Sequence, residues 1–512
     1  MNLPLLTILT GAPILCGIML LLLRTDQRVA RKLAIAFSFI PLALVAYLWR
    51  NFDNTSGSLQ FIEKYPWIPS LRVDYFLAID GLGLLMVTLS AAVIPFAVIA
   101  TTHAQQSKLY YALMLFLQAG LLGTFTALNF FHWFIFWELS LVPAFFLIKL
   151  WGGEKRSAAA LQFFIYTMVG SIAMLVAFVG LFIATNTFDF IQLSELARNG
   201  QLAQLVTANL SGLGLSSDAL SMLLFAGVFL GFAVKVPLIP FHTWLPLTYS
   251  EAPTTTSMVL TGVMSKMGVY GFIRVLLPIF PEQMRAVLTP LLWLAVATII
   301  FSAYAAFVQK DLKRIVAYSS INHLGYCLLG LFAVVKAGDA SLLNERAAAL
   351  NGVILQMFNH GITASALFCF VGFLEHRNHG ARGIEDFGGM RKVAPVLCGL
   401  MGITMFSSLG LPGLNGFVGE FMIFKGTFSL SAWAAAIATI GLLATAIFLL
   451  TVIQKVFSGP VKENHAWVDL TIAERLTVAP MIALMFVLGI APHLLLQVIN
   501  PTVTQMLAAV KF

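Results

Sequence analysis

The sequence predicts an all-α polytopic membrane protein with about 14 transmembrane helices. Hydrophobic residues make up 59% of the 512-residue chain and charged residues only 10%, whereas soluble domains carry roughly 25% charged residues. Apolar stretches of about 20 residues, the length that crosses the hydrocarbon core, recur from end to end. We therefore expect residues 1–512 to form a single transmembrane domain.

The apolar stretches give the spans in chain order. Three form an N-terminal group within 1–101, five fill 109–278, five more fill 286–457, and the last lies in a C-terminal region at 472–512, expected as helix 14. The expected spans are residues 3–23, 33–50, 77–101, 109–128, 130–150, 160–186, 220–241, 254–278, 286–307, 314–335, 346–374, 394–424, 432–454 and 476–498.

Two of these spans are interrupted. Span 7 carries Lys235, with Pro237 and Pro240 close behind it, and span 12 contains Gly410-Leu-Pro-Gly-Leu-Asn-Gly416. Proline lacks a backbone N–H and ends a helix. The carbonyl groups that a break leaves free are tolerated at membrane depth only where they face protein or water. We expect helices 7 and 12 to be broken beside a buried or water-filled cavity.

The ionisable residues within the spans indicate an internal repeat. Glu138 and His323 are 185 residues apart, and so are Lys235 and Glu420. Five spans separate the members of each pair, so spans 4–8 and 9–13 would cross the membrane in opposite directions. Inverted repeats with broken helices near the membrane centre are typical of transporters. The pattern predicts two inverted five-helix repeats.

The basic residues are distributed unevenly between the two sides of the membrane. Of the 30 Lys and Arg residues, eighteen lie in connections that follow odd-numbered spans, nine lie on the other side and three lie within spans. By the positive-inside rule the odd connections face inward and both termini lie on the outer side. The formal charge of +8 therefore reflects topology, and no nucleic-acid partner is expected.

Cysteine usage argues against a redox centre in this chain. Cys16, Cys327, Cys369 and Cys398 are scattered singly in apolar spans, and no C-x-x-C pair or nucleotide-binding fingerprint occurs. Single cysteines in apolar helices usually pack as small hydrophobic residues. We expect no metal and no cofactor in this polypeptide.

Several polar residues near span ends are given simpler roles. His376 and His379 lie in the 375–393 connection, which is expected to be a solvated polar loop. Positioning or interfacial roles are expected for His242, Glu251 and Tyr304.

Glu138 and Lys235 are the first pair of candidate functional residues. A lysine at the centre of a membrane helix costs about 3 kcal/mol, and an isolated carboxyl group in an apolar helix stays neutral unless a cation lies near it. Lys235 is the candidate partner of Glu138, and such a pair would switch when either group changes its protonation. The alternative is a static buried ion pair.

A second group of candidates lies further along the chain. Lys266 is flanked by glycines and is expected to be a central proton carrier, or else a counter-charge for a neighbouring helix. His323 and His360 would relay protons near neutral pH, or pack as hydrogen-bonded core residues. Glu420 ends the line. No catalytic triad or phosphate loop accompanies these residues, so proton translocation is the expected chemistry of Glu138, Lys235, Lys266, His323, His360 and Glu420.

Four motifs resemble the antiporter-like membrane subunits of respiratory complex I. They are Phe136-Trp-Glu-Leu-Ser-Leu-Val-Pro143, Lys235-Val-Pro-Leu-Ile-Pro-Phe-His-Thr-Trp-Leu-Pro246, the segment 311–325 and Gly410-Leu-Pro-Gly-Leu-Asn-Gly-Phe-Val-Gly-Glu-Phe421. The resemblance covers roughly residues 75–480. It implies fourteen helices in two inverted repeats, a proton path through Glu138, Lys235, Lys266 and Glu420, and histidines 323 and 360 that link the halves.

The resemblance also implies partners and a location. Other membrane subunits of the complex would pack beside this chain in a bacterial inner membrane. NAD, FMN, iron–sulfur clusters and quinone would be bound by partner subunits. The chain departs from the family at Leu247-Thr-Tyr249, where an Asp-Ala-His segment is usual, and at Gln162, where many members have lysine. Both departures lie near the cytoplasmic ends of spans 6–8, where protons would enter, and neither touches the Glu138–Lys235 pair.

We expect a proton-translocating subunit of an NADH:quinone oxidoreductase, driven by quinone reduction elsewhere in the complex. One alternative is a subunit of a Mrp-type sodium/proton antiporter, which usually carries lysine where Glu420 stands. Others are a subunit of a related membrane hydrogenase or ferredoxin-fed complex, and a purely structural scaffold.

Overall fold

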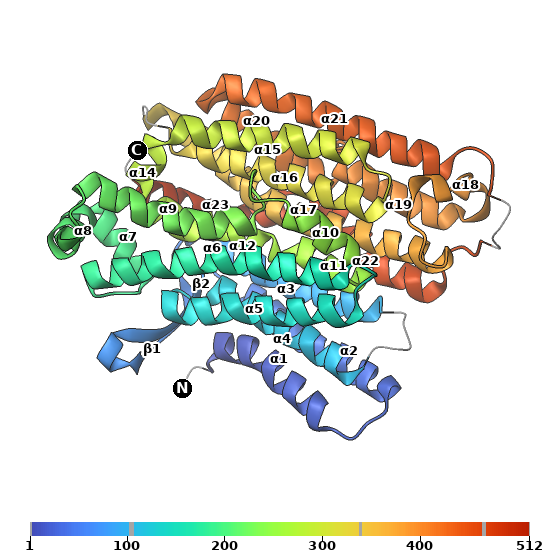
Figure 1. Ribbon diagram of the computed structural model, residues 1–512, viewed down its shortest axis with the longest axis horizontal. Coiled ribbons are helices and arrows are strands. Elements are labelled where there is room, and N and C mark those ends of the chain that lie inside the picture. The colour runs from blue at the N-terminus through green and yellow to red at the C-terminus, as the bar shows by residue number, and fades with distance from the viewer. Residues whose placement is uncertain (1–2, 102–106, 337–339, 463–466, 511–512) are drawn as a thin grey trace.

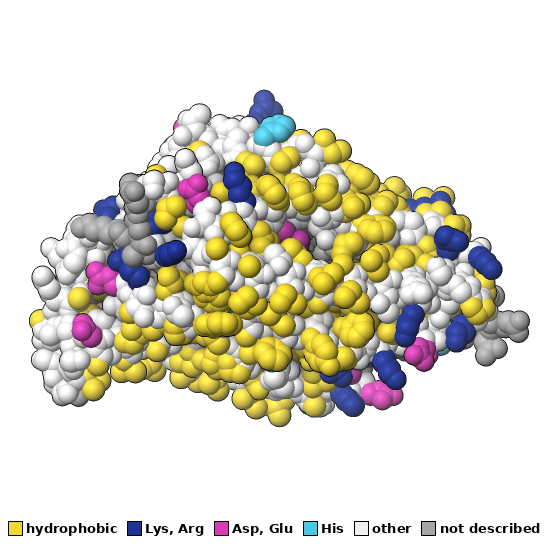
Figure 2. Space-filling model, turned by 90° about the horizontal axis from the view of Figure 1, so that it is seen from above, with side chains coloured by type: hydrophobic (Ala, Val, Ile, Leu, Met, Phe, Trp, Pro, Cys, Tyr) yellow, Lys and Arg dark blue, Asp and Glu magenta, His cyan; other side chains and the backbone are white. Residues whose placement is uncertain are grey.

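The described residues form one bundle of long, roughly parallel helices. A computed structural model describes residues 3–101, 107–336, 340–462 and 467–510. Within these residues, 13 helices are long and apolar enough to cross a membrane. Figure 1 shows them side by side, with the connections gathered at the two ends of the bundle. Figure 2 shows a broad hydrophobic belt between two ends where charged side chains gather. The all-α membrane fold is therefore confirmed.

The spans follow the predicted order. The N-terminal group is α1 (Leu5–Leu22), α2 (Gln27–Asn51) and α3 (Gly81–Ile99). The next five are α4 (Lys108–Thr126), α5 (Phe130–Trp151), α6 (Arg156–Thr185), α9 (Ser217–Lys235) and the span Thr254–Ile279. The remainder are α15 (Leu288–Val308), α16 (Leu312–Val334), α17 (Leu343–Arg377), the broken pair α19 (Pro395–Ser408) and α20 (Asn415–Leu430), α21 (Ala432–Phe457) and α22 (Ile472–Ile490).

Short polar side chains set where several of these helices begin. Asp26 accepts a hydrogen bond from Val29 N, and Asp80 accepts one from Gly83 N. Thr471 and Glu474 form a reciprocal capping box at the start of α22. These caps satisfy backbone N–H groups that have no partner within the helix. We call the end of the bundle that holds the connections after odd-numbered spans the basic side.

Both predicted breaks are present. Helix α9 ends at Lys235, and the chain turns before the short helix α10 (Trp244–Glu251). Helix α19 ends at Ser408 and α20 starts at Asn415. Gly410 and Gly413 between them adopt φ +77° and +93°, a conformation that glycine adopts without steric cost. Counting α19 and α20 as one broken span gives the fourteen expected.

Span 8 differs from the uniform helix predicted at 254–278. It runs as α11 (Thr254–Val259), a π-helix (Leu260–Met264), α12 (Lys266–Gly271), a second π-helix (Phe272–Leu276) and α13 (Leu277–Ile279). In a π-helix each N–H group bonds to the carbonyl group five residues earlier, instead of four as in an α-helix, so the turn holds an extra residue. Such turns are frequent at functional sites. Hydrophobicity does not distinguish an α-helical segment from a π-helical one, so the sequence pattern could not reveal the π-helices of span 8.

The long connections on the side opposite the basic one are structured. Residues 51–80 contain the antiparallel strands β1 (Gln60–Ile68) and β2 (Val73–Ile79), so span 3 starts at Gly81 rather than near residue 77. Residues 187–219 contain α7 (Phe190–Arg198) and α8 (Gln201–Leu210). The sequence analysis gave these connections no secondary structure.

The hairpin is tied to the bundle by charged side chains. Glu63 accepts hydrogen bonds from Leu6 N (2.7 Å) and Thr7 N (3.0 Å) at the start of α1. Lys64 Nζ lies 2.7 Å from Asp189 Oδ2 at the start of α7. Carboxylates stabilise helix N-termini, so the hairpin holds two helix ends in place.

The C-terminal region predicted as one helix comprises two, α22 and α23 (His493–Ala509), because Pro492 follows Ala491 where the first helix ends. Shorter elements complete the fold: α14 (Pro281–Ala286), α18 (Met390–Val393) and 3-10 turns at Pro69–Leu71, Ser211–Leu213, Ala340–Leu342 and Ile384–Asp386.

Burial identifies the centre of the bundle. Every residue in the most apolar window of Thr254–Ile279 is buried, and so is 94% of the corresponding window in α16 and in α17, against 33% in α1 and α21. The side chains on span 8, α16 and α17 are therefore surrounded by protein and not by lipid.

Candidate functional site

Lys235 is the last residue of α9 and only 2% exposed. Its ammonium lies 4.9 Å from the centre of the Trp137 ring on α5, and it has no hydrogen-bond partner among the described residues. A cation is stabilised by a helix C-terminus and by the face of an indole ring. Trp137 is itself fixed, because its Nε1 donates to Ser171 on α6 over 2.9 Å.

Glu138 follows Trp137 on α5. It is partly exposed, and Ile135 and Val142 on the same helix face are each 44% exposed. One of its carboxylate oxygens has no hydrogen-bond partner in the described structure. No salt bridge joins Glu138 to Lys235 among the described side chains, but the two groups lie close enough to interact electrostatically.

Lys266 lies between the two π-helical segments of span 8 and is fully buried. In the first segment Ser265 N donates to Leu260 O, so Thr261 O is not used by the donor that an α-helix would supply. That carbonyl oxygen accepts from Lys266 Nζ over 2.5 Å and from Ser265 Oγ over 3.0 Å. The widened turn thus provides the lysine with an acceptor from its own helix.

The lysine is also in contact with the second half of the chain. Lys266 Nζ lies 2.8 Å from His360 Nδ1 on α17, a contact that a protonated lysine makes with a neutral imidazole. The His360 ring is 5.0 Å from the ring of His323 on α16, centre to centre. His323 Nδ1 lies 3.0 Å from Glu420 Oε1 on α20. Four of the six predicted residues therefore form one continuous series.

Neutral side chains complete this series. Gln356 Nε2 donates to Glu420 Oε1 over 3.3 Å and lies 3.4 Å from His323 Nδ1. Ser408 Oγ, at the end of α19, lies 3.0 Å from His323 Nε2. The sequence analysis missed Gln356 and Ser408. Their signals were present, because Gln356 precedes His360 by one helical turn and Ser408 directly precedes the break in span 12.

The break in span 12 is held by a pair of asparagines. Asn359 Nδ2 on α17 donates to Asn415 O over 2.7 Å, and Asn415 Nδ2 donates back to Asn359 O over 3.3 Å. Asn415 Oδ1 also accepts from Ser407 Oγ over 2.6 Å. These bonds fix the start of α20, and therefore the position of Glu420, against α17 and α19.

Two further charged clusters were not assigned from the sequence. Arg274 and Asp80 form a buried ion pair of 2.6 Å at the far end of span 8 from the basic side. On the basic side, Lys313 and Glu375 lie 2.8 Å apart in the wall of a cavity of about 600 Å³. Lys313 had been counted with the surface connections, yet it is only 2% exposed.

Comparisons with known proteins identify the family of this chain. The family model of the NADH:quinone oxidoreductase/Mrp antiporter transmembrane domain matches residues 127–447. NADH-quinone oxidoreductase subunit M of Rickettsia typhi is 33% identical over 518 residues, which cover 99% of each chain. A chain of respiratory complex I from Thermus thermophilus with bound NADH superposes with a TM-score of 0.84, at 26% identity over 99% of this chain and all of that one.

The fold is shared more widely than the sequence. A chain of the Mrp complex from Dietzia sp. DQ12-45-1b has the same TM-score of 0.84 and covers all of both chains, at 19% identity. That likeness shows the fold alone, whereas the full-length identity to the Rickettsia protein distinguishes between branches of the family. The chain belongs to the NADH:quinone oxidoreductase/Mrp antiporter family and, within it, to the NADH-quinone oxidoreductase M subunits.

Proposed function

We propose that this chain translocates protons across a membrane as part of the membrane arm of an NADH:quinone oxidoreductase. The observation that carries the proposal is the series Lys266, His360, His323 and Glu420, whose members contact one another across four helices. Each of these groups gains or loses a single proton. A buried chain of such groups lets a proton pass from one to the next without an exposed charge in the hydrocarbon.

Lys235 and Glu138 would control the series from the first repeat. Lys235 has no hydrogen-bond partner among the described residues, so its charge is stabilised by the helix end and the Trp137 ring rather than by a fixed bond. A change in the charge of Glu138 would alter the field at Lys235 and at the groups beyond it. Because Glu138 is partly exposed at the chain's lateral surface, a neighbouring subunit could bring about that change.

The redox cofactors of the complex are proposed to lie in other chains. NAD, FMN, iron–sulfur clusters and quinone would be held by partner subunits, and quinone reduction there would drive the movement of protons here. The excess of Lys and Arg in the odd connections supports an inward-facing basic side and termini on the periplasmic side of a bacterial inner membrane.

The test uses inverted membrane vesicles that contain the whole complex. In Lys235→Ala and Glu138→Gln variants we expect NADH-driven acidification of the vesicles to be lost while the assembled complex is recovered in normal amount. Glu385→Gln is the matched control, because Glu385 is a 70% exposed carboxylate on the basic side. Acidification at the wild-type rate in both core variants would overturn the proposal.

A further inference from the structure

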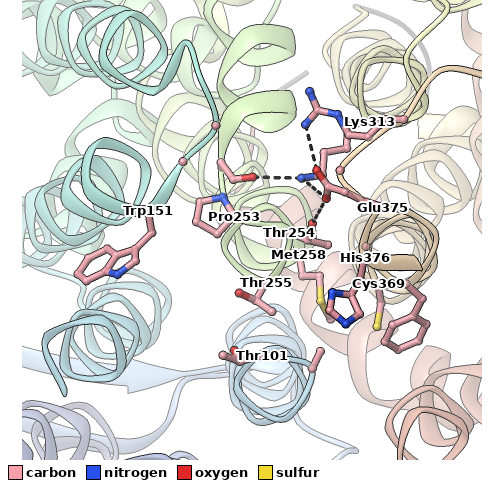
Figure 3. A pocket seen from close by; sticks show the side chains of 18 of the residues that line it. Thr101, Trp151, Pro253, Thr254, Thr255, Met258, Lys313, Cys369, Glu375 and His376 are labelled. Atoms are coloured by element: carbon pink, nitrogen blue, oxygen red, sulfur yellow. Dashed lines mark hydrogen bonds and ion pairs between the residues drawn. The ribbon is translucent and has the colours of Figure 1, made fainter. Parts of the chain in front are cut away.

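The cavity on the basic side lies at the inner ends of both repeats. Helices α5, α10, α11, α16 and α17 and the connection after α3 contribute to its walls. Figure 3 shows Lys313, Glu375 and Thr254 together on one side of it and Trp151 on the other. Thr255 and Met258 line it, and Met258 precedes Lys266 by eight residues, which is about 12 Å of helix. The cavity therefore leads toward the buried series.

The stretch between the cavity and Lys266 is rich in hydroxyl groups. Between Thr255 and Lys266, span 8 carries five buried hydroxyl side chains and no other polar type: Thr255, Thr256, Ser257, Thr261 and Ser265. Hydroxyl groups both donate and accept hydrogen bonds. Water that enters this stretch would find partners, so its access must be controlled at the cavity.

Glu375 links the elements of the cavity wall. Its Oε2 lies 2.8 Å from Lys313 Nζ and accepts from Thr254 Oγ1 over 3.0 Å, and its Oε1 lies 3.4 Å from Arg382 Nη1. Thr254 starts span 8 in the first repeat, whereas Lys313 and Glu375 belong to α16 and α17 in the second. One carboxylate therefore joins the two repeats.

The two cations also hold backbone groups of the first repeat. Arg382 Nη1 donates to Ser250 O over 2.5 Å, and Lys313 Nζ donates to Ala252 O over 3.4 Å. These carbonyl groups lie where α10 ends, before Pro253, and the last carbonyls of a helix have no partner within it. Cations are favourable partners for such groups. The junction of α10 and α11 is thus fixed by side chains of the second repeat.

Arg382 has other acceptors within reach. Its Nε lies 3.0 Å from Asp311 Oδ2, and its Nη2 lies 3.9 Å from Glu251 Oε1. Removing one partner of a buried ion pair is costly when the other charge is left alone. Here the guanidinium keeps a carboxylate partner if Glu375 moves away, whereas the buried Lys313 would lose its ion-pair partner, so Lys313 is what holds Glu375 in place.

We propose that Glu375, Lys313 and Arg382 form an ionic latch, which holds the α10–α11 junction against the second repeat and so limits the access of water from the cavity to the buried side chains of its wall and of span 8. The effect on proton movement rests on the proposed function, but the effect on water access does not. None of the three residues contacts the Lys266–Glu420 series in the described structure, so their role is positioning.

Native Cys369 reports on the latch, because it lines the cavity and is only 2% exposed. The purified complex is treated with a small methanethiosulfonate reagent, and the rate of labelling at Cys369 is measured by peptide mass spectrometry. Cys398, which is 5% exposed and does not line the cavity, is the internal reference. In Glu375→Gln we expect Cys369 labelling to rise at least about tenfold, and in Glu385→Gln we expect no change.

Thr254→Val is the second variant, for the case in which Glu375→Gln does not assemble. It keeps the shape of the side chain and removes only the hydroxyl donor to Glu375, so a smaller rise of about threefold is expected. Wild-type labelling of Cys369 in the assembled variant would overturn the latch. Vesicle acidification is read separately: if Lys266→Leu still pumps protons, the proposed function fails while the labelling result stands.

Discussion

Lys266 shows what a single residue in the sequence can and cannot predict. A lysine in an apolar segment is costly enough to mark a functional position, so the residue itself was identified. The identity of its acceptor was not, because Thr261 O becomes available only through the π-helical hydrogen bonding of Leu260–Met264. A sequence states which side chains are present, whereas the backbone hydrogen bonds of a single helical turn depend on tertiary packing.

Gln356 gives a test at the scale of one residue. Gln356→Leu keeps the approximate volume but removes the donor to Glu420. Because a buried carboxylate that loses a hydrogen-bond donor is less stable in its charged form, we expect proton pumping to slow by about tenfold with assembly unchanged. NADH-driven acidification in vesicles measures the effect. Gln454→Leu, at an exposed position of α21, is the control, and equal rates in the two variants would contradict the role given to Gln356.

Gly410 gives a second residue-scale prediction. A Cβ atom at Gly410 would lie 2.7 Å from Glu420 Oε2, and its φ of +77° disfavours any other residue. Gly410→Ala should therefore displace the Glu420 carboxylate or the break between α19 and α20. We expect the variant to assemble into the complex but to lose proton pumping. Gly413→Ala is the comparison, since it has a similar backbone conformation but open space around the Cβ position. An equal loss in both variants would point to backbone strain alone.

At the scale of elements, the two broken helices were predictable because proline and glycine act locally. The hairpin β1–β2 and the helices α7 and α8 were not, because their polar residues are satisfied by distant partners. Glu63 caps α1, more than fifty residues earlier in the chain, and Lys64 pairs with Asp189, well over a hundred residues later. No local pattern carries that information.

Helix α19 has a cap of the same distant kind, and it predicts a dependence on pH. Asp469 accepts from Val396 N and Leu397 N, each over 2.9 Å. Burial raises the pKa of Asp469, but the backbone N–H donors lower it by more, so it lies below the ordinary value of 3.8. A lowered carboxyl pKa stabilises the fold above that ordinary value, and the contribution is lost as pH falls through the lower one.

Asp469→Ala should cost about 1 kcal/mol of stability at neutral pH. The loss is measured as a lower thermal unfolding temperature of the purified complex, or of this chain within it. Because the wild-type cap is itself lost in acid, the difference between wild type and variant should shrink below pH 4 or so. A difference that stays constant from pH 7 to pH 3 would show that the carboxylate charge is not what caps α19.

At the scale of the whole molecule, the sequence predicted the number, order and breaks of the spans because the bilayer allows few architectures. Among the candidate residues, it grouped Lys235 with Glu138 and left the histidines as links. The structure brings Lys266, His360, His323 and Glu420 into one series and places Lys235 beside the ring of Trp137. Distances between helices depend on how they pack, which spacing along the chain does not encode.

The carboxylate at Glu420 and the sequence identity to M subunits lead to a prediction about the transported ion. If protons alone move through the complex, replacing sodium by potassium in the buffer should leave NADH-driven acidification unchanged. The measurement needs only wild-type inverted vesicles and a pH-sensitive dye. Acidification that depends on sodium would instead favour the antiporter function of the wider family.

The π-helical turn before Lys266 has one more consequence. Deleting a residue from an ordinary transmembrane helix rotates everything beyond it by about 100°, which usually scrambles the packing. A π-bulge already contains one surplus residue, so deleting Val263 would convert Leu260–Met264 into a regular turn and leave the angular phase of the flanking helix nearly intact. The shortened chain would keep its lysine facing α17 and lose only the spare carbonyl. We therefore expect span 8 to tolerate the deletion of Val263, which keeps the charge of Lys266, whereas a substitution of Lys266 would remove that charge.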